Sequence, residues 1–246
     1  MATVSYVRVH TAGSIVKSAF AIFARHFGVL FLTVLIFQAP IIAAQVLSVG
    51  EAPVFWMLIL VSAIIIVIFL SVAPLTVLIA DICLGAAPDL GRAFRRAFGT
   101  LTGRVVRTVL LVWVTLAVGF LLLVVPIMIF ATWYMLALCV VVLERTSPRA
   151  SLRRSKLLGK GFYLRNLGVL VLMSVITFVS AAIVGAVVSA VGGAIGLPLR
   201  LIVLIGGVIG AACAVPGSIA PILLYYDMRC RKEGYDTRRL AEDLSH

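Results

Sequence analysis

Five long runs without any charged residue dominate this 246-residue sequence. They cover residues 27–50, 52–80, 108–143, 166–199 and 201–226. Each exceeds the roughly 20 residues that an α-helix needs to cross the hydrocarbon core of a bilayer. Only 12% of the residues are charged and 63% are hydrophobic, whereas a soluble domain averages about 25% charged residues. Lipid must therefore surround most of the chain, because a soluble fold of this length has too little interior for so much apolar surface.

The run 108–143 is too long for a single crossing. As one helix, 36 residues would extend about 54 Å at 1.5 Å per residue, against a hydrocarbon core of about 30 Å. Arginines flank both of its ends, so both ends belong on the same side and the run crosses twice. We expect the turn at Val125-Pro126, because proline disrupts a helix interior. The glycine-rich tail 192–198 predicts a loop after a span over 167–191, which brings the total to six spans.

The basic residues predict the orientation of these spans. Of the 21 Lys and Arg residues, 20 fall in the N-terminal lead, the tail or the connections after the second and fourth spans. The opposite connections hold only Arg200, with Glu51 as their sole acid. The positive-inside rule makes the basic side cytoplasmic and places both ends of the chain there. Because short topogenic segments account for the net charge of +12, we expect no nucleic-acid binding. The first run is longer than a signal-peptide core, so we expect it to remain a span.

A threefold pattern runs through the chain. Basic amphipathic segments over residues 14–25, 89–98 and 151–158 precede the three pairs of spans. Their apolar residues recur at spacings of three and four, which favours helices lying in the membrane interface; plain cytoplasmic connectors are the alternative. The expected fold is all-α: one polytopic membrane domain over residues 1–246, with six transmembrane helices in three hairpin-like pairs. Its expected place is the inner or plasma membrane of the cell.

Each pair of spans closes with a single acid, namely Asp81, Glu144 or Asp227. Each is the first charge after an apolar run, so we expect all three at the cytoplasmic boundary of the membrane. A carboxylate there is partly desolvated and repelled by anionic lipid, and a nearby arginine relieves both costs. We favour this structural pairing over a ligand or coupling site. The expected partners are Arg92, Arg95 or Arg96 for Asp81, Arg153 or Arg154 for Glu144, and Arg229 or Arg231 for Asp227.

Little in the sequence points to catalysis or to a cofactor. No ionisable residue lies in the middle of a span, which weakens an ion-coupled transporter, and the soluble nucleotide, hydrolase and zinc-protease motifs are missing. The four cysteines form no CxxC pair, so we expect no metal or redox site. Small residues recur at spacings of four, at Gly185, Ser189 and Gly193 and at Gly206 and Gly210. They predict close packing of the last two spans, with dimerisation as the alternative.

Three stretches resemble one bacterial and archaeal family, the membrane domain of glycerophosphoryl diester phosphodiesterases. They are the amphipathic lead and span over residues 15–38, the junction LALCVVVLERTSPRASLRRSKLLGK over 136–160, and the closing stretch APILLYYDMRCRKEGYDTRRL over 220–240. The resemblance covers nearly the whole chain and implies a six-helix membrane module. The soluble phosphodiesterase barrel that often follows in that family is not expected after His246, so no phosphodiesterase activity is implied. Leu138-Cys139 departs from the pattern, where a proline is expected.

The function expected from these features is non-enzymatic. A multi-spanning module of this kind anchors or scaffolds partners, or engages lipids, at the cytoplasmic leaflet. Its expected partners are membrane lipids with anionic headgroups, together with a protein partner or a second copy of the chain. The leading alternative is a transporter or channel for a small or lipid-like solute, and an intramembrane lipid-metabolising enzyme is a third.

Overall fold

The computed structural model describes residues 9–49, 54–99, 102–122 and 136–234. Every regular element in these ranges is an α-helix, which agrees with the predicted all-α class. The helices are α1 (Ala12–Arg25), α2 (Phe27–Leu47), α3 (Val54–Cys83), α4 (Leu90–Phe98), α5 (Thr102–Leu122), α7 (Ala137–Glu144), α8 (Pro148–Gly159), α9 (Tyr163–Ala194) and α10 (Leu199–Glu233). The turn predicted at Val125-Pro126 lies outside the described residues.

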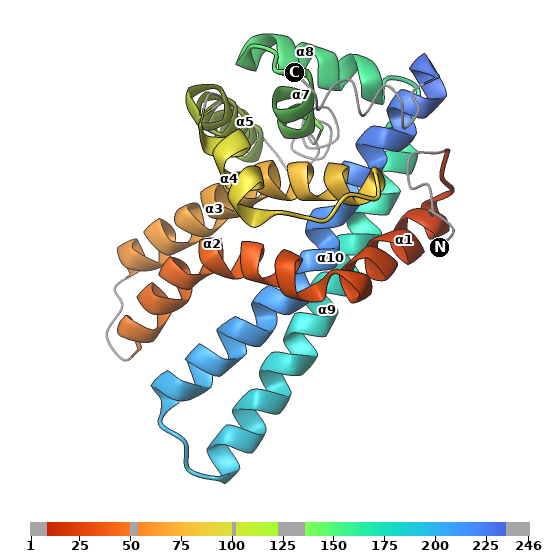
Figure 1. Cartoon of the computed structure of the whole chain (residues 1–246). Coiled ribbons are helices and arrows are strands. Elements are labelled where there is room, and N and C mark those ends of the chain that lie inside the picture. The colour runs from red at the N-terminus through yellow and green to blue at the C-terminus, as the bar shows by residue number, and fades with distance from the viewer. Residues whose placement is uncertain (1–8, 50–53, 100–101, 123–135, 235–246) are drawn as a thin grey trace.

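Two long helical hairpins form the lower part of the molecule (Figure 1). The α9–α10 hairpin reaches furthest from the body, and the α2–α3 hairpin extends to one side of it. At the opposite end, α7 and α8 lie together, while α1 runs across the α9–α10 hairpin. In the described part of the chain, α2, α9 and α10 are long and apolar enough to cross a membrane, and Leu70–Cys83 in α3 forms a shorter apolar stretch. The protein is therefore of a membrane-embedded type.

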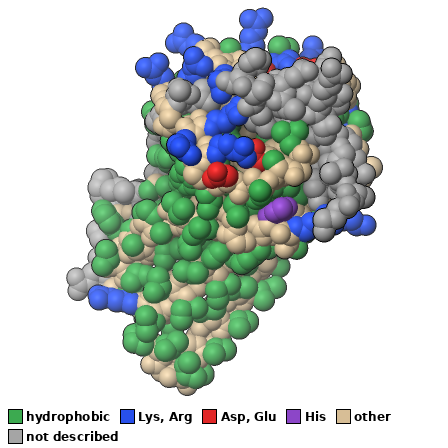
Figure 2. All heavy atoms as spheres, viewed as in Figure 1, with side chains coloured by type: hydrophobic (Ala, Val, Ile, Leu, Met, Phe, Trp, Pro, Cys, Tyr) green, Lys and Arg blue, Asp and Glu red, His purple; other side chains and the backbone are tan. Residues whose placement is uncertain are grey.

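The buried core lies at the end where the short helices gather. The stretch of α7 is almost entirely buried, as are the last two turns of α3 and the part of α10 from Ile219 to Met228. By contrast, the side chains of Phe178 and Ile183 on α9 are 74% and 59% exposed. Figure 2 shows the same division on one face, with hydrophobic side chains over the lower body and most of the Lys and Arg side chains at the upper end. A continuous exposed apolar surface of this kind suits lipid as its neighbour.

The connection between α9 and α10 is shorter than the sequence predicts. Residues 192–194, expected in a loop, belong to α9, which ends at Ala194. The reason is packing: a Cβ on Gly192 would lie only 2.7 Å from Ile202 Cγ1, so this glycine lets α10 approach closely. The reversal falls instead at Gly196, whose φ of 71° is left-handed and suits glycine.

The glycines that join the helices are not the ones predicted. A Cβ on Gly185, Gly193, Gly206 or Gly210 would meet nothing within 4 Å, so the interpretation of these positions as the α9–α10 packing face is wrong. Close approach occurs at other glycines. A Cβ on Gly207 would lie 3.0 Å from Ile42 of α2, and one on Gly217 would lie 2.8 Å from Thr177 of α9. A spacing of four identifies a face, but it does not say which face meets a neighbour.

Valine substitutions at the neighbouring residues Gly207 and Gly206 test the packing of α10 on α2, with Gly206 as the matched control. Gly207→Val forces a branched side chain against buried Ile42 and should destabilise the fold by about 1 to 3 kcal/mol, the usual cost of overpacking. Gly206→Val makes the same chemical change in the same helix turn, where there is open space. We expect thermal unfolding in detergent to show a clearly lower midpoint for Gly207→Val alone. Equal midpoints for the two variants would contradict the α2–α10 contact.

Candidate functional site

Three short helices at the polar end begin in the same way. The N-cap residues are Thr11 for α1, Asp89 for α4 and Ser147 for α8. Each side-chain oxygen accepts a hydrogen bond from the backbone N–H three residues further on, at 3.3, 3.1 and 3.4 Å respectively. A capping side chain of this type satisfies one of the amides that a helix start leaves without a partner. The caps therefore give the three amphipathic segments a common register.

The short helices also bury the same positions when they are counted from the caps. The fourth and eighth residues after each cap have no exposed surface; they are Ile15 and Ala19, Ala93 and Ala97, and Ser151 and Ser155. The sixth residue is exposed and basic in every case, namely Lys17, Arg95 and Arg153. A spacing of four places the buried pair on one face. Each short helix is thus docked by a narrow stripe of small or aliphatic residues and turns its basic face outward.

Asp81, at the end of α3, binds the short helix that follows it in the chain. Arg92 of α4 donates to Asp81 Oδ2 at 2.9 Å. The Asp81 side chain is only 7% exposed, while that of Arg92 is 50% exposed. Of the other two expected partners, Arg95 donates to the Gly91 carbonyl, whereas Arg96 lies within electrostatic reach of Asp81. The pair fastens the start of α4 to the end of α3.

Glu144, at the end of α7, connects three helices. Arg154 of α8 donates to Glu144 Oε2 at 3.1 Å, and the Tyr225 hydroxyl of α10 donates to Glu144 Oε1 at 3.0 Å. Arg154 also pairs with Glu233 near the end of α10. Burial acts to lower the pKa of Arg154, but the two carboxylates outweigh burial and raise that pKa above its ordinary value. Arg153, the other expected partner, is exposed on the outer face of α8.

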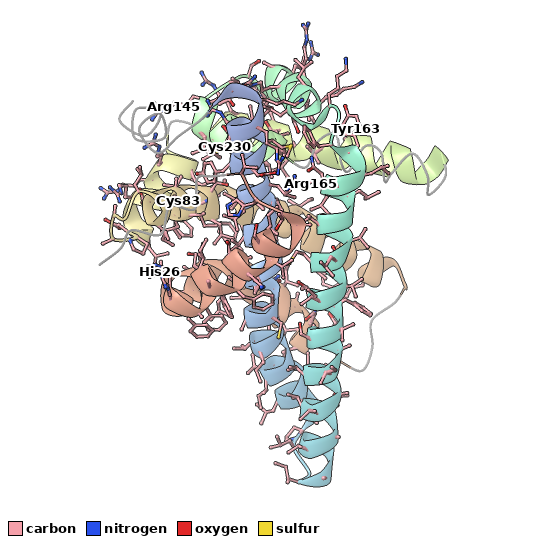
Figure 3. The ribbon with its side chains drawn as sticks, turned by 90° about the vertical axis from the view of Figure 1, so that its right-hand side faces the viewer. His26, Cys83, Arg145, Tyr163, Arg165 and Cys230 are labelled. Carbon is pink, nitrogen blue, oxygen red and sulfur yellow. The ribbon has the colours of Figure 1, made fainter. Side chains whose placement is uncertain are left out.

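Asp227 of α10 is the most enclosed carboxylate of the three, with no exposed surface. Arg165, at the start of α9, donates to its Oδ2 at 2.6 Å, and Arg231 donates to its Oδ1 at 3.1 Å. The backbone N–H of His10 completes the set at 2.6 Å. Both arginines also donate to the His10 carbonyl, at 2.6 and 2.7 Å. The segment ahead of α1 is therefore held at both of its peptide groups; Figure 3 labels Arg165 where α9 lies beside α10.

These three contacts follow one rule around the molecule. The acid near the end of an apolar helix binds the short helix that follows it in the chain, as Asp81 of α3 does with α4 and Glu144 of α7 does with α8. Asp227, the last acid, binds the segment that leads into α1, the first short helix. The threefold sequence pattern thus corresponds to a closed ring of contacts rather than to a row with two free ends. We call these three carboxylates, with the groups bound to them, the acid clamps.

Sequence reasoning found the three acids but only some of their partners. The structure brings Arg92 to Asp81, Arg154 to Glu144 and Arg231 to Asp227. It takes Arg229 away from Asp227, because Arg229 donates to Glu233 and to the Tyr225 hydroxyl. The missed partners are Arg165, the His10 backbone and Tyr225, together with Arg229, whose Nε lies 3.9 Å from Glu144 Oε1. Arg165 could have been found by analogy with Arg104. Each is the third residue of its helix, Arg165 in α9 and Arg104 in α5, and the Arg104 side chain donates to the Arg145 carbonyl at 2.7 Å.

Several hydroxyls of the apolar helices are satisfied within their own helices. The hydroxyls of Thr33, Thr76 and Ser218 each donate to a carbonyl four residues earlier, at 2.8, 2.7 and 3.3 Å. A bond of this kind satisfies the hydroxyl within its own helix, so the hydroxyl needs no partner from a neighbouring helix. All four cysteines are free thiols, and no group of three His, Cys, Asp or Glu side chains suited to a metal occurs among the residues that the structure describes. The polar interactions that the structure describes are therefore mainly ion pairs that hold helices together.

Comparisons with known proteins add no relative to this picture. No family model matches the sequence, and neither curated proteins nor solved structures give a significant match. The assignment of a function therefore depends on the geometry of the acid clamps and on the distribution of apolar and basic surface.

The acid clamps predict an order of mutational effects. Asp227→Asn removes a fully buried charge and leaves Arg165 and Arg231 without their common partner, which should cost about 3 to 5 kcal/mol. Asp81→Asn should cost about 1 kcal/mol, because its partner Arg92 is half exposed and can turn to water. Thermal unfolding in detergent measures both. A charge swap that combines Asp81→Arg with Arg92→Asp should recover part of the loss, and a swap no better than Asp81→Arg alone would contradict the pairing.

Proposed function

We propose that this chain is a six-span membrane module that holds three basic helices against the cytoplasmic leaflet, where it engages anionic lipids and anchors or scaffolds partner proteins. The observation that carries the proposal is the division of the surface. The α9–α10 hairpin presents apolar side chains outward, while the acid clamps hold three short helices at the other end with a basic residue outward on each. Basic groups at such a level attract the anionic headgroups of a cytoplasmic leaflet.

The proposed span count extends beyond the three long apolar helices α2, α9 and α10. Helix α3 has 30 residues, enough to cross the core of a bilayer with some tilt. Helix α5 has 21 residues, and the charge-free run that starts within it at residue 108 continues to residue 143. We propose that this run supplies two further crossings. The one-sided distribution of Lys and Arg supports a cytoplasmic position for both ends of the chain.

The anchoring function is favoured over the transporter because of how the polar groups are used. A transporter needs polar groups that converge on a solute near the middle of the membrane. The hydroxyls of Thr33, Thr76 and Ser218 instead donate to their own helices. The three acids lie at the polar end and are engaged by arginines, so their chemistry is that of attachment. Membership of the glycerophosphoryl diester phosphodiesterase membrane-domain family belongs to the same proposal and rests on the three stretches that resemble it.

Cysteine labelling tests the proposed topology. In a background with the four native cysteines replaced, Ile195→Cys places a thiol at the turn after α9, where the native side chain is 67% exposed. Arg153→Cys places one on the exposed face of α8. In intact cells, a membrane-impermeant maleimide should label position 195 and leave position 153 unlabelled until the cells are opened. Labelling of position 153 from outside would reject the orientation.

Native mass spectrometry of the protein purified in mild detergent tests the function itself. The proposal predicts retained anionic phospholipid or a co-purifying protein, and no turnover of glycerophosphodiesters with divalent metal. The same preparation, reconstituted in sealed vesicles, should not increase solute efflux. A protein that retains neither lipid nor a partner would contradict the anchoring function. Steady solute flux through the reconstituted protein would favour the transporter alternative instead.

A further inference from the structure

Four arginines meet where α4, α5 and the connection between α7 and α8 come together. We call Arg92, Arg96, Arg104 and Arg145 the arginine cluster. Arg104 Nη1 donates to the Arg145 carbonyl at 2.7 Å, which ties the start of α5 to the end of α7. Arg145 is the C-cap of α7 and has a φ of 50°, the left-handed conformation that commonly ends a helix but that usually falls on glycine. Figure 3 labels Arg145 in the upper part of the molecule, among the short helices.

Among the residues that the structure describes, the arginine cluster has more positive charge than its carboxylates neutralise. Asp81 is engaged by Arg92 at 2.9 Å, and Asp89 uses its carboxylate to cap α4. Burial lowers the pKa of Arg96, and the nearby charge of Arg145 lowers it further, an effect that Asp81 only partly offsets. The Glu144 clamp shows the opposite balance, since Glu144 and Glu233 raise the pKa of Arg154. Like charges held together at a partly buried site favour an anion between them.

Within the described part of the chain, two buried polar atoms beside this charge have no hydrogen-bond partner. They are Arg145 Nε and Thr146 Oγ1. A buried donor without a partner is costly to the fold, and a charged donor more so. They belong to adjacent residues, and neither residue is one of those that clamp a short helix. A guanidinium N–H and a hydroxyl are groups that bind phosphate oxygens.

We propose that Arg145 and Thr146, with Arg96 and Arg104, bind the phosphate group of an anionic ligand. Phosphate oxygens accept from the Arg145 Nε–H and the Thr146 hydroxyl, and the other guanidinium groups balance the charge. The proposal deepens the proposed function and rests on it, because it names the site at which the module engages anionic headgroups. The Arg104 guanidinium carries further N–H groups besides the one on the Arg145 carbonyl, so that bond does not consume it.

The exposed face of α5 favours a phospholipid as the source of that phosphate. Val106, Leu110 and Val114 are 39%, 48% and 50% exposed and follow Arg104 along the same helix. Their spacing of four places them on one face of α5, which is not the face that carries Arg104, so this helix turns apolar side chains outward just beyond the level of the arginine cluster. A phospholipid whose phosphate lies on the cluster has its acyl chains at the depth of this apolar face. A soluble phosphate ester gains nothing from it.

Ligand-dependent thermal unfolding of the full chain in a neutral detergent tests the proposal. The titrants are short-chain phosphatidylglycerol, short-chain phosphatidylcholine and glycerol 3-phosphate. We expect phosphatidylglycerol to raise the midpoint and phosphatidylcholine to leave it unchanged. Arg145→Gln should weaken the apparent affinity for phosphatidylglycerol by about tenfold or more, as loss of a charge-assisted bond to phosphate requires. Arg153→Gln makes the same change on the exposed face of α8 and should weaken it by no more than about threefold.

Thr146→Val provides a second variant that keeps the shape and every charge. Without ligand it should unfold at the same or a higher temperature, because it removes a buried hydroxyl that has no partner. With phosphatidylglycerol its upward shift should be smaller than that of the original protein. This opposite pair of effects separates a ligand-binding hydroxyl from a merely structural one.

The possible results distinguish this site from the function on which it rests. If Arg153→Gln weakens binding as much as Arg145→Gln, diffuse charge explains the affinity and the site is wrong, while anchoring to anionic lipid stands. If phosphatidylglycerol leaves the midpoint of the original protein unchanged, the site is rejected, and native mass spectrometry decides separately on the anchoring function. If glycerol 3-phosphate matches phosphatidylglycerol at equal concentration, the phosphate chemistry holds and the lipid as its source is overturned.

Discussion

The enclosed carboxylate of Asp227 is the interaction on which the arrangement of the short helices most depends. A carboxylate with no exposed surface is stable only if its charge is paired and its oxygens are hydrogen-bonded. Arg165 and Arg231 supply the charge, and the His10 backbone supplies the remaining bond. Because the two arginines also hold the His10 carbonyl, satisfying this one acid joins α9, α10 and the segment that leads into α1.

The same solution at the other two acids makes the polar end a ring. A short amphipathic helix has too little apolar surface to hold itself against a bundle, and in lipid the apolar effect between helices is weak. Carboxylates at the ends of the apolar helices provide directional attachment instead. We expect these attachments to differ in strength. The attachment at Asp81 is the weakest because its partner is half exposed, and the one at Asp227 is the strongest because that carboxylate is fully enclosed. The lower part of the molecule needs no such attachment, because close packing at Gly192, Gly207 and Gly217 brings its helices together.

Hydropathy predicted most of the helices because charge-free runs and basic amphipathic segments are local signals. The predicted segment over 14–25 corresponds to α1, and the one over 89–98 corresponds to α4 with its Asp89 cap. The three acids were found for the same reason, each being the first charge after a run. Their partners were harder to predict, because Asp227 meets Arg165 and His10 across 62 and 217 residues of chain. The predicted assignment of glycines to the helix-packing face was wrong, because spacing alone does not reveal which side of α10 meets Ile42 of α2.

Hydrogen–deuterium exchange of α1 in the Asp227→Asn variant tests the central claim most directly. The acid clamps hold α1 through the His10 peptide groups, so losing the carboxylate should release the start of α1 while the α9–α10 hairpin stays folded. Amides from Ile15 to Ile22 should then exchange much faster than in the original protein, with those in the middle of α9 unchanged. If α1 keeps its full protection in the variant, the short helix is held by its buried stripe alone, and the acid clamp is not what fastens it.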